Sequence, residues 1–159
     1  MLSSLRHSVG TAYKFIKIGH QEQLTLLDKY YLRRISRYID HDLSGLDIRF
    51  TAGLVRPHDI YIGPSSGLFQ YLQTQNCFHV ALFSLNNPRR YIFQKNPEKI
   101  IPIIRSELPC IRCMEKSFEF MSRANCIAND RACCISGIGE EQIVSAVKSL
   151  LVRISCAKT

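Results

Sequence analysis

The amino-acid sequence predicts a single α+β domain, over residues 1–159, with a small, mostly antiparallel sheet. Near both ends of the chain, apolar residues recur every three or four positions, which is typical of amphipathic helices. The middle of the chain has short apolar runs separated by Gly, Pro and Asn, which is typical of strands joined by turns. With 159 residues and 46% hydrophobic content, the chain is long enough to build one core.

The first forty residues predict a pair of helices. Residues 1–20 carry no acid, and their apolar residues follow helical spacing, so this segment is interpreted as the first helix of the domain. A targeting peptide and a helix lying on a membrane surface are the alternatives for the same pattern. Residues 21–39 predict the second helix, because apolar side chains line one face and no Gly or Pro interrupts it.

The sheet is predicted from residues 47–94. Strands are expected at Asp47–Val55 and Ile60–Ile62, and the nearly continuous apolar run Cys77–Leu85 is expected to be the central strand. A short helix over residues 66–74 separates the last two. A turn at Asn86–Pro88 is expected to lead into a hairpin partner at Arg90–Gln94.

The second half of the chain is predicted to be helical. Asn96 and Pro97 are typical of a helix start, and Pro102 is expected to limit that helix. Helices are also expected over residues 114–123 and in a short segment that ends at Gly137. The final helix, Glu140–Ser155, has the clearest pattern, with acids at its start and bases later, as the helix dipole favours.

The charge favours an acidic partner. The chain has a net charge of +8, and residues 1–39 contain seven basic and two acidic side chains. Nucleic acid or an acidic protein surface is therefore the expected partner. No apolar run reaches the roughly 18 residues of a membrane span. Seven cysteines without regular spacing indicate a reducing compartment, which predicts a cytoplasmic or nuclear protein, with the mitochondrion as the alternative.

A row of cations on the second predicted helix is the candidate nucleic-acid site. Lys29, Arg33 and Arg37 are spaced four residues apart, Arg34 lies next to the row, and Tyr30 is close by. Such cations can follow a phosphate backbone while the ring stacks on a base. Arg89 and Arg90 are expected to share this surface. A solvated charged helix face is the alternative interpretation.

The spacing of the cysteines predicts zinc as a cofactor. Cys110 and Cys113 form a CxxC pair that, with Cys126 and Cys133, predicts a structural zinc site. Cys134 is the alternative to Cys133, and His58 or His79 could be recruited as a ligand. Ordinary burial in a core is the alternative. A redox pair is disfavoured, because such a pair follows a strand and opens a helix, whereas residues 102–109 do not have a strand pattern.

Cys126 is also a candidate nucleophile, with His58 or His79 as its base. The segment Ala124–Cys126, together with the upstream segment His58–Gly63, resembles the permuted papain-like acyltransferases of the lecithin:retinol acyltransferase type. That resemblance implies a cysteine-dependent acyltransferase or hydrolase, in which a histidine activates the thiol. The chain departs from the family at His58, which lies three residues before Tyr61 instead of four, and at Ile127 and Ala128, where the family has Glu-His-Phe.

The leading functional hypothesis is a small, basic, intracellular interaction or regulatory protein that binds nucleic acid and has a structural zinc site. The thiol enzyme that uses Cys126 is the first alternative. A protein-binding adaptor without catalytic activity is the second.

Overall fold

The structure of the chain is a computed structural model that describes residues 2–19, 26–93, 95–108, 110–113 and 133–156. The side chains of residues 26–29, 31 and 133 are outside this description. The chain divides into two compact units, residues 1–54 and 55–159, and each is described by itself. The single domain over residues 1–159 stays a prediction.

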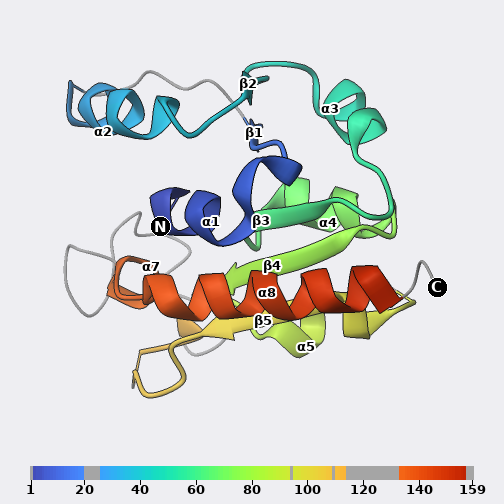
Figure 1. The fold of residues 1–159 in the computed structure, drawn as a ribbon. Helices are drawn as coiled ribbons and strands as arrows, with labels where there is room; N and C mark the ends of the chain where they lie inside the picture. The colour runs from blue at the N-terminus through green and yellow to red at the C-terminus, as the bar shows by residue number, and fades with distance from the viewer. Residues whose placement is uncertain (1, 20–25, 94, 109, 114–132, 157–159) are drawn as a thin grey trace. The chain divides into compact units, whose positions relative to one another are not determined.

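The first unit is mostly helical and contains a very short parallel sheet (Figure 1). Its elements are α1 (Leu2–Val9), the 3-10 helix η1 (Gly10–Ala12), β1 (Ile16–Lys17), α2 (Leu26–Ser36), β2 (His41–Asp42) and α3 (Ile48–Leu54). Strand β1 pairs with β2, so that Lys17 lies opposite Asp42. Two helices are present as expected, but the first is shorter than the predicted residues 1–20: α1 ends at Val9, and Ile16–Lys17 form β1.

Asp40 connects three parts of this unit. Its Oδ2 atom accepts hydrogen bonds from the backbone N–H of Phe15 at 2.6 Å and from Nη2 of Arg6 at 2.5 Å. The same Arg6 nitrogen also donates to the carbonyl oxygen of Tyr38 at 2.8 Å. One ion pair therefore joins α1, the segment entering β1 and the segment following α2.

The strand expected at Asp47–Val55 is wrong, because these residues form α3. Asp47 starts the helix: its Oδ1 accepts from the backbone N–H of Arg49 at 2.8 Å, as an N-cap carboxylate does. The alternation of Ile48, Phe50 and Ala52 predicts a strand that carries these three residues on one face. In the helix Ile48 and Phe50 are exposed, whereas Ala52 is buried together with Thr51.

The second unit contains a three-stranded parallel sheet in the order β3-β4-β5. Its elements are β3 (Ile60–Pro64), α4 (Gly67–Gln73), β4 (Phe78–Phe83), α5 (Pro88–Tyr91), the 3-10 helix η2 (Pro97–Lys99), β5 (Ile100–Ile104), α7 (Cys133–Ser136) and α8 (Glu140–Cys156). The mostly antiparallel sheet predicted from the sequence is therefore wrong. The predictions of a strand near residues 60–62, a helix near 66–74, a central strand at 77–85 and a final helix are confirmed.

The sheet is parallel because no hairpin forms after β4. The expected hairpin partner Arg90–Gln94 is wrong: the side chain of Asn87 accepts from the backbone N–H of Arg89 at 3.1 Å and Pro88 occupies the first turn, so a short helix begins instead. The chain then returns to the starting end of the sheet before β5. Parallel neighbours require such crossovers.

The helix expected after Asn96 is also wrong beyond its first turn. After η2 the chain enters β5, which contains Pro102. A proline is tolerated in a strand at the edge of a sheet, and β5 pairs only with β4 among the described strands. The expectation that the chain just before the CxxC pair contains no strand is therefore corrected by β5.

Helices cover both faces of this sheet (Figure 1). On one face, the fully buried Phe69 of α4 meets His79 and Phe83 of β4 edge to face, with ring centroids 5.3 and 5.7 Å apart. On the other face, α8 packs on β4 and β5 through one apolar stripe. The buried residues of α8 are Ile143, Ala146, Val147, Leu150 and Ile154.

Replacing Phe69 by alanine tests this packing. We expect Phe69→Ala to lower the free energy of unfolding by about 3–5 kcal/mol, because the cavity removes ring contacts and buried apolar area. Tyr71→Ala is the matched control on the same helix, since that ring is 39% exposed, and we expect less than about 1.5 kcal/mol there. Urea unfolding followed by circular dichroism measures both. Equal losses in the two variants would show that α4 does not pack on the sheet through Phe69.

Candidate nucleic-acid interface

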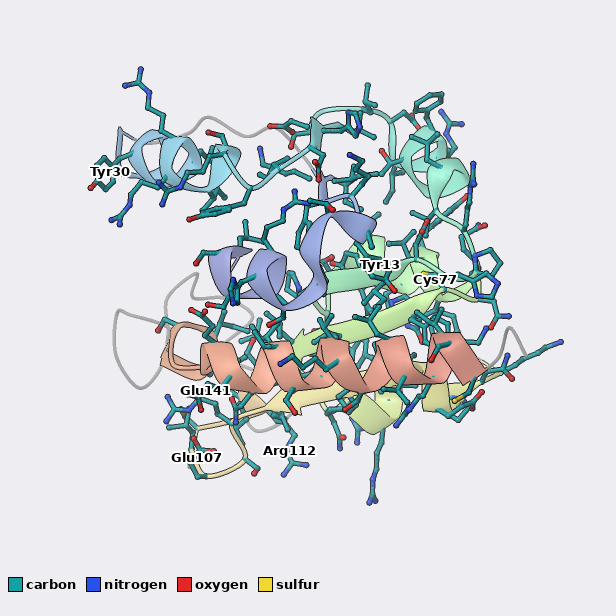
Figure 2. All side chains as sticks on the ribbon, in the orientation of Figure 1. Tyr13, Tyr30, Cys77, Glu107, Arg112 and Glu141 are labelled. Atoms are coloured by element: carbon teal, nitrogen blue, oxygen red, sulfur yellow. The ribbon has the colours of Figure 1, made fainter. Side chains whose placement is uncertain are left out.

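Helix α2 presents an uncovered basic surface. Arg33 and Arg34 are exposed on the helix, and Arg37 is exposed in the turn that follows it. Tyr30 lies one turn earlier, and its side chain is 55% exposed and projects from α2 (Figure 2). The guanidinium carbon of Arg34 is 5.9 Å from the centroid of the Tyr30 ring, which is a cation–π distance. Arginine and tyrosine side chains therefore share this side of the helix.

The described carboxylates at the end of this unit are paired with other cations. Asp40 is bonded to Arg6 at 2.5 Å, Asp42 to Lys17 at 3.0 Å, and Asp47 to Arg49 at 3.1 Å. Among the described residues, no ion pair joins a carboxylate to the α2 arginines, which are Arg33, Arg34 and Arg37.

The pKa values of these carboxyl groups agree with this pairing. Hydrogen bonds from the side chain and backbone of Ser44, and then from Lys17, lower the pKa of Asp42 to about 2. Hydrogen bonds from Arg49 lower the pKa of Asp47 to about 2. The pKa of Asp40 is lowered, first by the Phe15 backbone and then by Arg6. All three groups are ionised at neutral pH and neutralise the cations that they bind.

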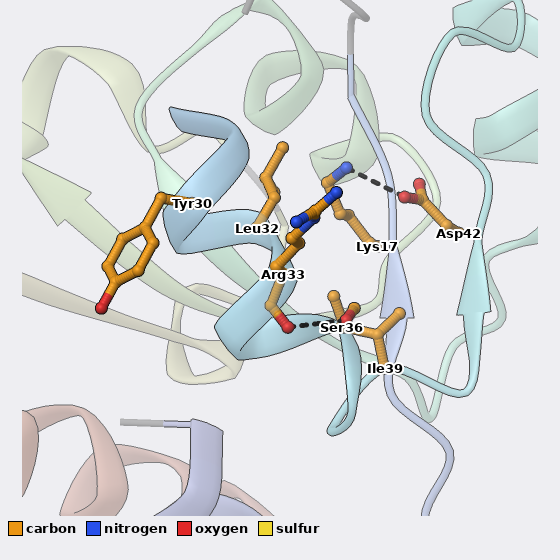
Figure 3. Close-up of a pocket in the computed structure, with 7 residues that line it drawn as sticks. All are labelled: Lys17, Tyr30, Leu32, Arg33, Ser36, Ile39 and Asp42. Carbon is orange, nitrogen blue, oxygen red and sulfur yellow. Dashed lines mark hydrogen bonds and ion pairs between the residues drawn. The ribbon is translucent and has the colours of Figure 1, made fainter. Parts of the chain in front are cut away.

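An open hollow of about 560 Å³ lies beside the basic surface. Figure 3 shows Arg33 between Tyr30 on one side and the Lys17–Asp42 ion pair on the other. The residues that line the hollow are Lys17, Tyr30, Leu32, Arg33, Ser36, Ile39 and Asp42. Apolar side chains next to cations suit a ligand that is both flat and anionic, such as a nucleotide.

Three other residues were predicted to contact nucleic acid: Lys29, Arg89 and Arg90. Arg89 and Arg90 are exposed on α5 in the second unit. That they share one surface with α2 stays a prediction. Lys29 belongs to α2, but its side chain is outside the described residues.

The candidate catalytic residues do not form a described site. Cys126 lies outside the described residues. His58 is exposed in the turn before β3. His79 is fully buried in β4, where its Nε2 lies 3.5 Å from the sulfur of Cys77. Cys77 was not predicted as a partner of His79, although it lies two residues before that histidine in the predicted central strand.

The Cys77–His79 pair is electrically neutral. Burial raises the pKa of the Cys77 thiol to about 11 and lowers the pKa of His79 to about 4. An activated thiol requires the opposite shift, in which a lowered pKa favours the thiolate. Both residues are fully buried and belong to the core of the second unit.

The cysteines expected to bind zinc are only partly described. Cys110 is half-buried and Cys113 is buried, whereas Cys126 and the side chain of Cys133 are outside the description. In the described part of the chain, no group of three or more His, Cys, Asp or Glu side chains could hold a metal ion. The four-cysteine zinc site stays a prediction. Likewise, none of the described helices combines the length and hydropathy needed to cross a bilayer.

The buried histidine predicts a pH dependence of stability. The pKa of His79 is about 4 in the folded chain and about 6.5 in an unfolded one. The unfolded chain therefore binds the additional proton, and stability that is complete above pH 6.5 is lost as the pH falls toward 4, by about 3 kcal/mol at most. Asp42 and Asp47 titrate below this window.

We expect His79→Leu to reduce the loss of stability between pH 6.5 and 4. Urea unfolding at several pH values measures the slope. His58→Gln, which changes an exposed histidine, should keep the slope of the original chain. If the slope is the same with and without His79, the imidazole is not held neutral by burial.

Comparison with known proteins finds no matching family model, no significantly similar curated protein and no significantly similar solved structure. A function for the chain must therefore be argued from its own residues. The strongest chemical feature among those described is the uncompensated basic surface of α2 beside the hollow.

Proposed function

We propose that the chain is a nucleic-acid-binding protein and that the surface of α2 binds a single strand. The observation that carries this proposal is the combination of three exposed arginines, which have no ion pair among the described residues, with the exposed ring of Tyr30. Proteins that bind single strands combine cations along the backbone with aromatic rings on which bases stack.

Charge placement supports this function more than net charge does. Among the described acids of this unit, Asp40, Asp42 and Asp47 bind Arg6, Lys17 and Arg49, and none binds an α2 arginine. Phosphates can then replace small counterions at Arg33, Arg34 and Arg37, and the release of those ions drives binding.

The hollow supports recognition of a base in addition to the phosphates. Leu32 and Ile39 provide apolar contact, and Tyr30 borders the same space. A base unstacked from a single strand presents a flat apolar face and polar edges, which Ser36 and Asp42 can contact. Base pairs within a duplex do not present these faces.

A protein-binding adaptor is the second candidate. Phe50 and Leu54 lie one helical turn apart on α3 and are 60% and 48% exposed. Neighbouring exposed apolar side chains are typical of protein-binding surfaces. If the chain is an adaptor instead, Phe50→Ser abolishes binding of a protein partner, and oligonucleotides bind without dependence on α2.

The test of the α2 surface compares two arginine variants of the same unit. We expect Arg33→Ala and Arg37→Ala each to weaken binding of a fluorescein-labelled single-stranded oligonucleotide. Each should also reduce the slope of log affinity against log salt concentration by about 0.7, because one phosphate contact is lost. Arg49→Ala should change little, since that arginine is paired with Asp47. Fluorescence anisotropy at several KCl concentrations measures affinity and slope.

Tyr30→Ala separates stacking from charge. We expect a loss of about 1–3 kcal/mol in binding free energy with an unchanged salt slope, because stacking releases no counterions. A duplex of the same sequence should bind more weakly than the single strand. The proposal is wrong if Arg49→Ala weakens binding as much as Arg33→Ala, since affinity would then follow net charge alone.

A further inference from the structure

The CxxC pair lies at the carboxyl edge of the parallel sheet. Strands β4 and β5 end at Phe83 and Ile104, and Cys110 follows β5 after a short loop. The backbone N–H of Arg112 donates to the carbonyl oxygen of Ser84, immediately after β4, at 2.9 Å. In open parallel sheets, ligand and reactive sites lie at this edge, because the loops that leave the strands converge there.

The backbone between the two cysteines forms a tight turn. Residues 110–112 are in turn conformation, and Cys113 is the first residue in helical conformation. Arg112 has a φ of +61°, in the left-handed region, where the chain changes direction sharply. A chain that turns within four residues brings its first and fourth Cα atoms within about 7 Å, and a disulfide requires about 4.4–6.8 Å.

The two thiols differ in accessibility. Cys110 is half-buried, whereas Cys113 is buried with 7% of its surface exposed, and neither forms a disulfide in this structure. A dithiol that exchanges with an external disulfide needs one sulfur that the substrate can reach and a second that only the first can reach. The difference between Cys110 and Cys113 matches these two roles.

We infer that Cys110 and Cys113 form a reversible dithiol–disulfide couple whose substrate is a solvent-accessible disulfide. The Cys110 thiolate attacks one sulfur of the substrate, which forms a mixed disulfide and releases the first substrate thiolate. The Cys113 thiolate then attacks the sulfur of Cys110 in the mixed disulfide. This step closes the internal disulfide and releases the second substrate thiolate. Two electrons pass from the dithiol to the substrate, and the two protons of the cysteines end on its thiols.

This couple does not depend on nucleic-acid binding, because it lies in the second unit and uses none of the α2 residues. Among the described residues no third ligand accompanies the pair, and zinc content separates this couple from the zinc site expected with Cys126 and Cys133. The described surroundings favour the couple over a purely structural role, because a cysteine that only fills the core would not leave Cys110 partly accessible.

The experiment is a redox titration of the full chain with reduced and oxidised glutathione, followed by acid quenching, alkylation and tryptic mass spectrometry. Trypsin cleaves after Arg105, Arg112 and Lys116, so the internal disulfide joins peptides 106–112 and 113–116. We expect this joined pair to appear in one two-electron step. Cys134→Ser and Cys156→Ser, which change other accessible thiols, should leave that step unchanged.

Single variants of the pair assign the two roles. Cys113→Ser should accumulate a glutathione adduct on Cys110, because the second thiol that releases it is absent. Cys110→Ser should leave Cys113 unmodified at the same glutathione concentration, because that thiol is buried. Three results would each overturn the inference: stoichiometric zinc that is lost in either variant, a disulfide from Cys110 or Cys113 to Cys126 or Cys133, or no joined peptides under oxidising conditions.

Discussion

The parallel pairing of β4 with both of its neighbours is the constraint on which the second unit depends. A parallel neighbour can be reached only by carrying the chain back to the starting end of the sheet, so each connection becomes a crossover. The central strand is then covered on both faces, by α4 through Phe69 and by the apolar stripe of α8. Because the strands are parallel, a cysteine before β4 and a cysteine after β5 lie at opposite ends of the sheet. Cys77 precedes β4 and is sealed against His79, whereas Cys110 follows β5 at the edge where loops meet solvent.

In the first unit, the distribution of ion pairs matters more than the number of charges. Asp40 and Asp42 lie two residues apart along the chain, and both bind cations from the first seventeen residues. These pairs hold β1 against β2 and fix the segment after α2, so the carboxylates have a structural use. Among the described residues, Arg34 and Arg37 of this surface instead lie over the aromatic rings of Tyr30 and Tyr38. The proposed binding of an anion by α2 would therefore break none of the described ion pairs.

Secondary-structure elements were predicted correctly where the spacing of neighbouring residues fits one structure only. The prediction was wrong where the same few residues fit two structures. The final helix and the central position of β4 followed from spacing and from continuous apolar character. Asn87 and Pro88 fit both a turn and a helix start, and choosing the turn gave the antiparallel sheet. The cations on α2 were identified from their spacing. The sequence did not show that the described carboxylates bind other cations, because those ion pairs join distant residues such as Arg6 and Asp40, 34 residues apart. The context of Cys110 was missed because Pro102 argued against the strand that precedes it.

Pro102 also bears on how the protein behaves at high concentration. It is exposed in β5, one of the two outer strands among the three described in this sheet, and it has no backbone N–H to offer to a further strand. Open sheet edges are templates on which chains of the same sequence can stack, and a proline on the edge is one of the ways in which natural proteins prevent this. The residue that concealed β5 in the sequence therefore protects the folded chain against self-association through that edge.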